Sequence, residues 1–219
     1  VKVNSRQFAG IHKLVVRVTE TLDLQREPEV FVTQNPSYQA FTLGSDYPFI
    51  VLSSSLVNDA DTEELTSVIG HEAGHIKSGH ALYKTIVYVV SQAGLSVLPF
   101  GNLISMPVLA ALKDWDRKSE LSADRAGLLA LQEENPCYSV LMKTAGGNHP
   151  GQMNIEEFFR QSEEYEKNNS FVDSIHKTMN ILWQTHPFPV LRLKELKMWA
   201  TSGTYENILN GDYPRTTGK

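Results

Sequence analysis

The spacing of apolar residues along the chain predicts an amphipathic helix followed by a small sheet. In the first twenty residues, apolar side chains recur at helical intervals on one face: Phe8, Ile11, Leu14, Val15 and Val18. Three runs rich in β-branched and aromatic residues follow, at 29–33, 38–43 and 49–52. Turn signals at Asn35-Pro36 and Gly44-Ser45-Asp46 separate these runs. The pattern favours a small, mainly antiparallel sheet.

Helical periodicity dominates the rest of the chain. Asp61, with Glu64 three residues later, forms an N-cap and capping-box pattern, and helical apolar spacing continues from Leu65 to Ile76. Further helices are expected at about 115–133, 137–145, 154–168, 170–183 and 188–201, followed by a flexible tail over about 210–219. The predicted fold class is therefore α+β, mostly helical with a small sheet.

The segment from Thr85 to Leu112 carries no charged residue, and Pro99 to Asn102 should interrupt it near its middle. Each half is too short to cross a bilayer, since about 20 apolar helical residues are needed for a hydrocarbon core of about 30 Å. Two interpretations of 85–112 stay open. It forms two short buried helices, or it forms a helical hairpin that contacts a membrane surface or a partner.

Composition restricts the function classes further. The chain has 219 residues, 41% of them hydrophobic, which fits a single domain over 1–219. Its net charge of -5 gives no basic field, so no nucleic-acid partner is expected. The single cysteine, Cys137, cannot form an internal disulfide or build a thiolate metal site. The cysteine content leaves the compartment open, and the sequence does not indicate an oligomeric state.

The segment His71-Glu72-Ala73-Gly74-His75 lies within the capped helix and has the H-E-x-x-H pattern. Four helical residues turn through about 400°, so His71 and His75 project from nearly the same side and can hold one Zn²⁺. Glu72 could accept a proton from a water molecule activated at that metal. His80 lies about 140° further around the helix than His75, so we expect it to make a cap or polar contact instead of binding metal.

A catalytic zinc site needs a third protein ligand. Glu120 and Asp124 lie four residues apart on an expected helix within Arg117 to Gly127. Glu120 is the ligand candidate, and Asp124 could accept the free N–H of a ligating imidazole. Read alone, this charged segment is more typical of a solvated helix face than of a metal site. The upstream motif favours the metal site.

Taken together, "GHEAGH" and "SELSADRAG" resemble a family of zinc metallopeptidases that includes HtpX, Oma-type proteases and CAAX prenyl endoproteases. In that family a glutamate in an E-x-x-A-D segment is the third zinc ligand, which here is Glu120. The segment "THPFPVLRLKEL" is similar to the family's His-Pro segment and places His186 and Arg192 at its conserved positions. "YQAFTLG" is similar to the family's edge strand, although Gln39 stands where asparagine is usual.

The resemblance implies a zincin-like fold and roles for these additional residues. His186, or a nearby tyrosine, could donate a hydrogen bond to the oxyanion, and Arg192 could orient a carboxylate ligand or hold the substrate backbone. The strand containing Gln39, Ala40 and Phe41 could bind an extended substrate through its main chain.

The resulting hypothesis is an endopeptidase with one Zn²⁺ per chain that hydrolyses unfolded or membrane-associated polypeptides. Association with a membrane is expected, on either its cytoplasmic or its periplasmic or lumenal side, with 85–112 as a possible contact surface. The alternative is a zinc-binding module that is either latent or catalytically silent. The presence of Glu72 disfavours the silent module, and the latent peptidase stays open. CAAX specificity is also disfavoured, because those enzymes span the membrane repeatedly.

Overall fold

The computed structural model describes residues 1–93, 101–147, 149, 152–167 and 189–213, and of 87–93, 101–110, 112–114 and 165–167 only the backbone. The expected helix 170–183, His186 and the end of the predicted tail lie outside the described residues. The elements near the N-terminus are α1 (Ala9–Thr21), β1 (Glu29–Thr33), β2 (Ala40–Leu43), β3 (Phe49–Ser53) and α2 (Ser54–Asp59). They are followed by α3 (Thr62–Lys77), α4 (His80–Ala93), α5 (Gly101–Leu131), α6 (Glu134–Gly146), α7 (Ile155–Lys167), α9 (Pro189–Ala200) and α10 (Thr204–Leu209).

The sheet is small and has strand order β1-β3-β2, so β2 is an edge strand of the described sheet. β2 pairs with β3 antiparallel, as expected, whereas β1 pairs with β3 in parallel. The sheet is therefore mixed, a correction to the mainly antiparallel arrangement predicted from short turns. The connection from β1 to β3 passes through β2, and this lets β3 insert between the two strands that precede it.

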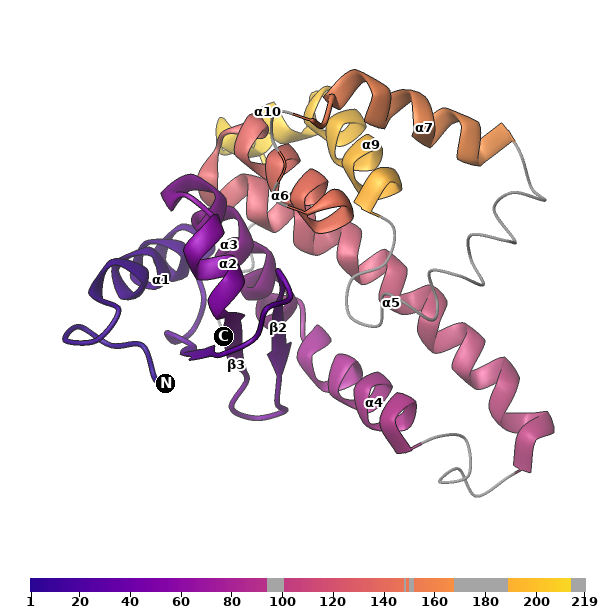
Figure 1. Cartoon of the computed structure of the whole chain (residues 1–219), viewed down its shortest axis with the longest axis horizontal. Helices are drawn as coiled ribbons and strands as arrows, with labels where there is room; N and C mark the ends of the chain where they lie inside the picture. The colour runs from indigo at the N-terminus through magenta and orange to yellow at the C-terminus, as the bar shows by residue number, and fades with distance from the viewer. Residues whose placement is uncertain (94–100, 148, 150–151, 168–188, 214–219) are drawn as a thin grey trace.

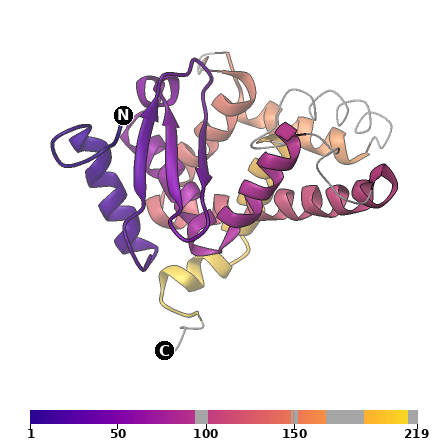
Figure 2. The same cartoon turned by 90° about the horizontal axis from the view of Figure 1, so that it is seen from below.

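One face of the sheet is buried against helices. Two rows of inward side chains cross the strands: Val32, Leu52 and Ala40 in one row, and Val30, Ile50 and Thr42 in the other. These rows form one hydrophobic core with residues of α1 and α3, among them Val15, Val18 and Ile69. In Figure 2 the sheet faces the viewer, with α1 to its left and α4 to its right.

A second core includes the C-terminal part of α5 but no residue of α3. There α5, α6, α9 and α10 meet around Leu128, Leu141, Leu193 and Tyr205. Figure 1 shows α6, α7, α9 and α10 gathered above the C-terminal half of α5, whereas α4 lies beside the opposite half. Helix α3 contacts both groups of elements, which places its central residues between the sheet and the helices.

Several helix boundaries differ from the sequence prediction. Helix α1 begins at Ala9, because residues 1–3 instead run beside β1, with Val3 N–H donating to the Val30 carbonyl at 2.8 Å. Asn4 turns the chain by accepting hydrogen bonds from the backbone N–H groups of Arg6 and Gln7. As a result Phe8 is 40% exposed and does not join the apolar face of the helix.

The uncharged segment also differs from its prediction. Its second half is not a separate short helix, because α5 runs without interruption from Gly101 to Leu131. This helix includes the predicted helix 115–133 except for its last two residues. Its first half lies in α4, and the expected break falls on residues outside the description. In the described part of the chain, no helix is both long and apolar enough to span a membrane.

Candidate metal centre

Helix α3 positions three of the predicted residues. Its N-terminus is fixed by the predicted capping box, in which the Asp61 carboxylate accepts from the Glu64 backbone at 2.8 Å and the Glu64 carboxylate accepts from the Asp61 backbone at 3.0 Å. His71 and His75 lie one turn apart with their rings edge to face, 4.8 Å between centroids. Both imidazoles and the Glu72 side chain are buried.

Glu120 reaches the two imidazoles because α5 packs very closely against α3. A Cβ atom added at Gly70 or Gly74 would lie 2.6 Å from an alanine Cβ of α5, and one added at Gly127 would lie 2.8 Å from the Ser67 carbonyl. Glycines on both helices therefore allow the backbones to approach. This approach brings Glu120 Oε2 to 3.4 Å from His71 Nε2 and Glu120 Oε1 to 3.3 Å from His75 Nε2. One nitrogen from each histidine and one Glu120 oxygen all lie within 4.8 Å of one another.

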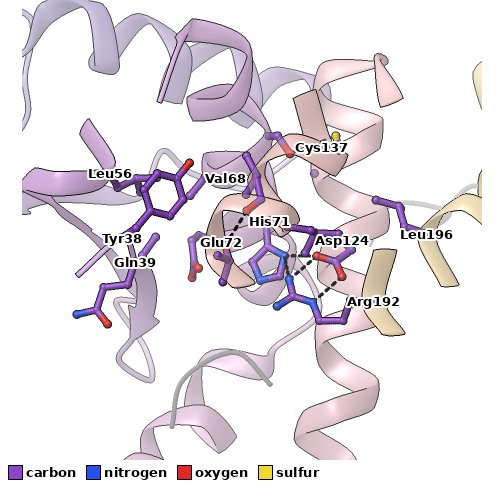
Figure 3. A pocket seen from close by; sticks show the side chains of 16 residues that line it. Tyr38, Gln39, Leu56, Val68, His71, Glu72, Asp124, Cys137, Arg192 and Leu196 are labelled. Atoms are coloured by element: carbon purple, nitrogen blue, oxygen red, sulfur yellow. Dashed lines mark hydrogen bonds and ion pairs between the residues drawn. The ribbon is translucent and has the colours of Figure 1, made fainter. Parts of the chain in front are cut away.

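Asp124 and Arg192 support one side of this cluster (Figure 3). His71 Nδ1 donates to Asp124 Oδ1 at 2.9 Å, which leaves Nε2 directed at Glu120. Arg192, from α9, donates two hydrogen bonds to Asp124, of 2.8 Å from Nε and 2.6 Å from Nη2. Its Nη1 atom lies 3.1 Å from Glu120 Oε2. One guanidinium thus orients both carboxylates.

Helix α4 supports the other side through two residues one turn apart. His80 Nδ1 lies 3.3 Å from His75 Nδ1, in agreement with the polar contact expected for this residue. The Lys84 ammonium donates to Glu120 Oε1 and, at 3.0 Å, to Asp116. Lys84 was missed by the sequence reasoning, although it is the last charged residue before the uncharged segment and is four residues beyond His80.

The buried charges perturb the titration of the cluster. Burial lowers the pKa of His71, but hydrogen bonds to Asp124 and Glu120 outweigh burial and raise that pKa to about 9. At His75 burial prevails, aided by the Lys84 charge, and the pKa falls well below its usual value. Burial alone would raise the pKa of Asp124, yet the adjacent Arg192 lowers it to about 2. Asp124 therefore stays ionised as the acceptor for His71.

The residues around the cluster fit a divalent cation in both donor type and charge. Imidazole nitrogens and a carboxylate oxygen are the donor set of catalytic zinc sites. The described side chains here include four largely buried carboxylates, Glu72, Asp116, Glu120 and Asp124, and two largely buried cations, Lys84 and Arg192. With neutral imidazoles, this set has a charge of -2, which one divalent cation would neutralise.

Glu72 lies beside the cluster, on the side that faces the sheet (Figure 3). Its carboxylate Oε2 accepts a hydrogen bond of 2.6 Å from the hydroxyl of Thr42 on β2. Glu72 and His71 also line a pocket between β2, α3, α6 and α9, whose walls include Ala40, Val68 and Leu141. Thr42 was not predicted as a site residue from the sequence, where the one signal was a hydroxyl at an inward position of an otherwise apolar strand.

The remaining predicted residues divide into three cases. Gln39, immediately before β2, and Ala40, on it, line the pocket, and the Gln39 backbone N–H donates to Ser53 Oγ at 3.2 Å. Phe41 lies on the opposite face of the sheet from Ala40, because successive strand residues alternate. His186 falls outside the described residues, so the structure does not place it relative to the cluster.

A motif helix beneath a small sheet, with a glutamate brought to its histidines by a later helix, defines a zincin-like metallopeptidase domain of the α+β class. The sequence pattern of peptidase family M48 matches residues 5–200. The chain belongs to peptidase family M48, in agreement with the resemblance drawn from its motifs.

Relatives with assigned names support this membership. A plastoglobule-localized metallopeptidase 48 from Arabidopsis thaliana chloroplasts is 34% identical over 214 residues, which cover 95% of this chain and 62% of that protein. A protease HtpX homolog from Helicobacter pylori is 33% identical over 101 residues, covering 45% of this chain and 33% of the relative. The chain thus spans less than two thirds of the length of either relative. No solved structure matches it significantly.

Proposed function

We propose that this chain is a zinc-dependent endopeptidase that cleaves internal bonds of unfolded or membrane-associated polypeptides. The observation that carries this proposal is the position of the buried Glu72 carboxylate, next to the convergent His71, His75 and Glu120 side chains and beside an edge strand. This arrangement supplies a metal-binding donor set, a proton acceptor and a surface for an extended peptide in one place.

Each protein group has a chemical task in this proposal. His71, His75 and Glu120 would hold one zinc ion, which when bound supplies Lewis-acid polarisation and lowers the pKa of a water molecule. Glu72 accepts the proton of the attacking water and passes it to the departing amine. Asp124 keeps His71 in the tautomer that binds through Nε2, and Arg192 holds Asp124 in place. His186 is proposed to donate a hydrogen bond to the oxyanion.

The proposed substrate binds as an extended strand along β2. Main-chain hydrogen bonds along this strand, beyond Gln39, whose N–H and carbonyl both bond to Ser53, would give affinity that is largely independent of substrate sequence. The adjoining pocket is lined by apolar side chains that include Leu56, Val68 and Leu141, which favours an apolar substrate residue close to the scissile bond. Unfolded polypeptides expose both extended backbone and apolar side chains.

Contact with a membrane surface is proposed through α4 and the uncharged segment that it begins. Leu82, Tyr83 and Ile86 on α4 are each between 39% and 48% exposed, and no charged residue lies between Lys84 and Lys113. The Arabidopsis relative is named as a plastoglobule-localized protein, which supports a lipid-associated setting. Co-sedimentation with lipid vesicles tests this proposal, and a Leu82→Ser/Ile86→Ser variant should sediment less than the unaltered chain.

The proposed activity is tested with an unfolded casein substrate and the zinc-loaded protein. The Glu72→Gln variant should retain zinc but lose at least about a hundredfold in cleavage rate, because an amide cannot accept the proton. Glu63→Gln is the matched control, since Glu63 is an exposed glutamate on the same helix. Equal cleavage by Glu72→Gln and the unaltered protein would refute the proposed role of Glu72.

A further inference from the structure

Thr42 occupies an inward position where an aliphatic residue would be expected. Its neighbours in the same row across the sheet are Ile50 and Val30, both buried, and Thr42 itself is only 1% exposed. Burying a hydroxyl costs free energy unless it is hydrogen-bonded. A valine has nearly the same shape and would fill the position without that cost, so the hydroxyl requires an explanation beyond packing.

The hydroxyl has one proton, and among the described residues it has two acceptors within reach, both of them on Glu72. The carboxylate Oε2 lies 2.6 Å from Thr42 Oγ1, and the Glu72 main-chain carbonyl oxygen lies 3.3 Å away. The shorter contact has the length of an O–H···O⁻ hydrogen bond, which is stronger than a bond between neutral groups. We therefore assign the hydroxyl proton to the carboxylate.

This bond fixes the direction of the carboxylate. A glutamate side chain has three rotatable bonds, so the backbone of α3 does not by itself determine which way the carboxylate faces. With Oε2 tied to β2, the other oxygen keeps a constant direction relative to the imidazoles of His71 and His75. Because β2 is also the proposed substrate-binding strand, the same bond sets the distance between the proton acceptor and a peptide aligned on that strand.

We propose that Thr42 is the positioning residue for Glu72. It acts through the carboxylate and does not itself touch the substrate. This inference rests on the proposed function and deepens it, by naming the group that aligns the proton acceptor with the substrate strand. Effective proton transfer requires the acceptor to lie within hydrogen-bonding distance of the proton it removes, so a misdirected carboxylate slows the reaction with little change in substrate binding.

The first test compares Thr42→Val, which removes the hydroxyl, with Thr42→Ser, which keeps it. In the zinc-loaded protein, Thr42→Val should lower kcat by about 10- to 100-fold with KM within about twofold and with unchanged zinc content. Thr42→Ser should recover most of the lost kcat. Thr66→Val is the matched control, because Thr66 is an equally buried threonine whose hydroxyl bonds only to the Thr62 carbonyl of its own helix. An unchanged kcat in Thr42→Val would overturn the assignment.

The second test uses the metal-free protein and does not depend on activity. Thr42→Val leaves the buried Glu72 carboxylate without this donor, so the melting temperature should fall by about 3–12 °C. In a Glu72→Ala background the same substitution should leave the melting temperature unchanged or raise it. Additive shifts would mean that the two side chains are not coupled, and would overturn the inference.

The two tests separate this inference from the proposed function. If Glu72→Gln cleaves casein as well as the unaltered protein, the proposed function fails. The coupling between Thr42 and Glu72 is then still tested by the melting temperatures of the metal-free variants. If Glu72→Gln is inactive but Thr42→Val is fully active, the endopeptidase proposal holds and only the role of Thr42 is lost.

Discussion

Replacing Gly74 with alanine tests whether the close approach of α3 and α5 builds the metal centre. A Cβ atom at this position would lie 2.6 Å from Ala126 Cβ and 3.2 Å from Ala123 Cα. Carbon atoms in contact are normally about 3.5–4.0 Å apart, so the two helices would have to separate by roughly 1 Å. Zinc–ligand distances tolerate deviations of only about 0.2 Å. Because Glu120 lies on α5 and His75 follows Gly74, this separation should weaken zinc binding directly.

The size of the effect follows from two opposing terms. Overpacking a tight contact costs about 1–3 kcal/mol, whereas alanine is favoured over glycine within a helix by about 0.8–1 kcal/mol. Gly10→Ala isolates the second term, because Gly10 lies in helix α1 with nothing within 4 Å of an added Cβ. The melting temperature of metal-free Gly74→Ala should therefore lie about 2–12 °C below that of Gly10→Ala, at roughly 2–4 °C per kcal/mol for a chain of this size.

Zinc affinity is measured by competition with a chelator for both glycine variants. Gly74→Ala should bind zinc at least about tenfold more weakly than the unaltered protein, which corresponds to about 1.4 kcal/mol. Gly10→Ala should bind it with unchanged affinity. If Gly74→Ala is as stable as Gly10→Ala and binds zinc equally well, the close helix approach does not control the geometry of the centre.

Three further predictions follow from the buried charges and from the thiol. Lys84→Met removes the ammonium beside Glu120 and Asp116, so the metal-free protein should lose about 3–5 kcal/mol of stability. The zinc-loaded protein should lose less stability, and thermal unfolding with and without a chelator measures both losses. Equal losses would contradict this explanation. Protons compete with zinc for His71, whose pKa is about 9, so zinc affinity should fall by up to about tenfold per pH unit below that value. Activity and metal content should fall together below about pH 6. Chelator competition at several pH values measures the affinity, and a pH-independent affinity would refute this prediction. Burial raises the pKa of the Cys137 thiol to about 12. The native protein should therefore react with a thiol reagent at pH 8 at least about a hundredfold more slowly than the unfolded chain. Immediate labelling of the native protein would show that the thiol is accessible.

The sequence predicted the local features of the fold well, because these depend on neighbouring residues. The capping box of Asp61 and Glu64 marks where α3 begins, and the structure shows both of its hydrogen bonds. The strands at 29–33 and 49–52 agree with β1 and β3 to within a residue. Strand order was not predictable in this way, since the parallel pairing of β1 with β3 depends on contacts between segments that turns do not join.

The candidate site was predictable where its residues belong to a motif with fixed spacing. His71, Glu72 and His75 share one helix, and Glu120 and Asp124 share another, so their faces follow from helical geometry. The supporting residues Thr42 and Lys84 come from β2 and α4, and only the packing of those elements brings them to Glu72 and Glu120. Similarly, the role of Gly70 and Gly127 becomes apparent only when the two helices are seen in contact.

The most direct measurement of the central claim is the zinc content and zinc affinity of the purified chain, compared with those of a Glu120→Ala variant. We expect one zinc ion per chain in the unaltered protein, and at least about a hundredfold weaker binding when the carboxylate that joins the two imidazoles is removed. Circular dichroism confirms that the variant is folded. A folded Glu120→Ala variant that binds one zinc ion with undiminished affinity would contradict the proposed centre.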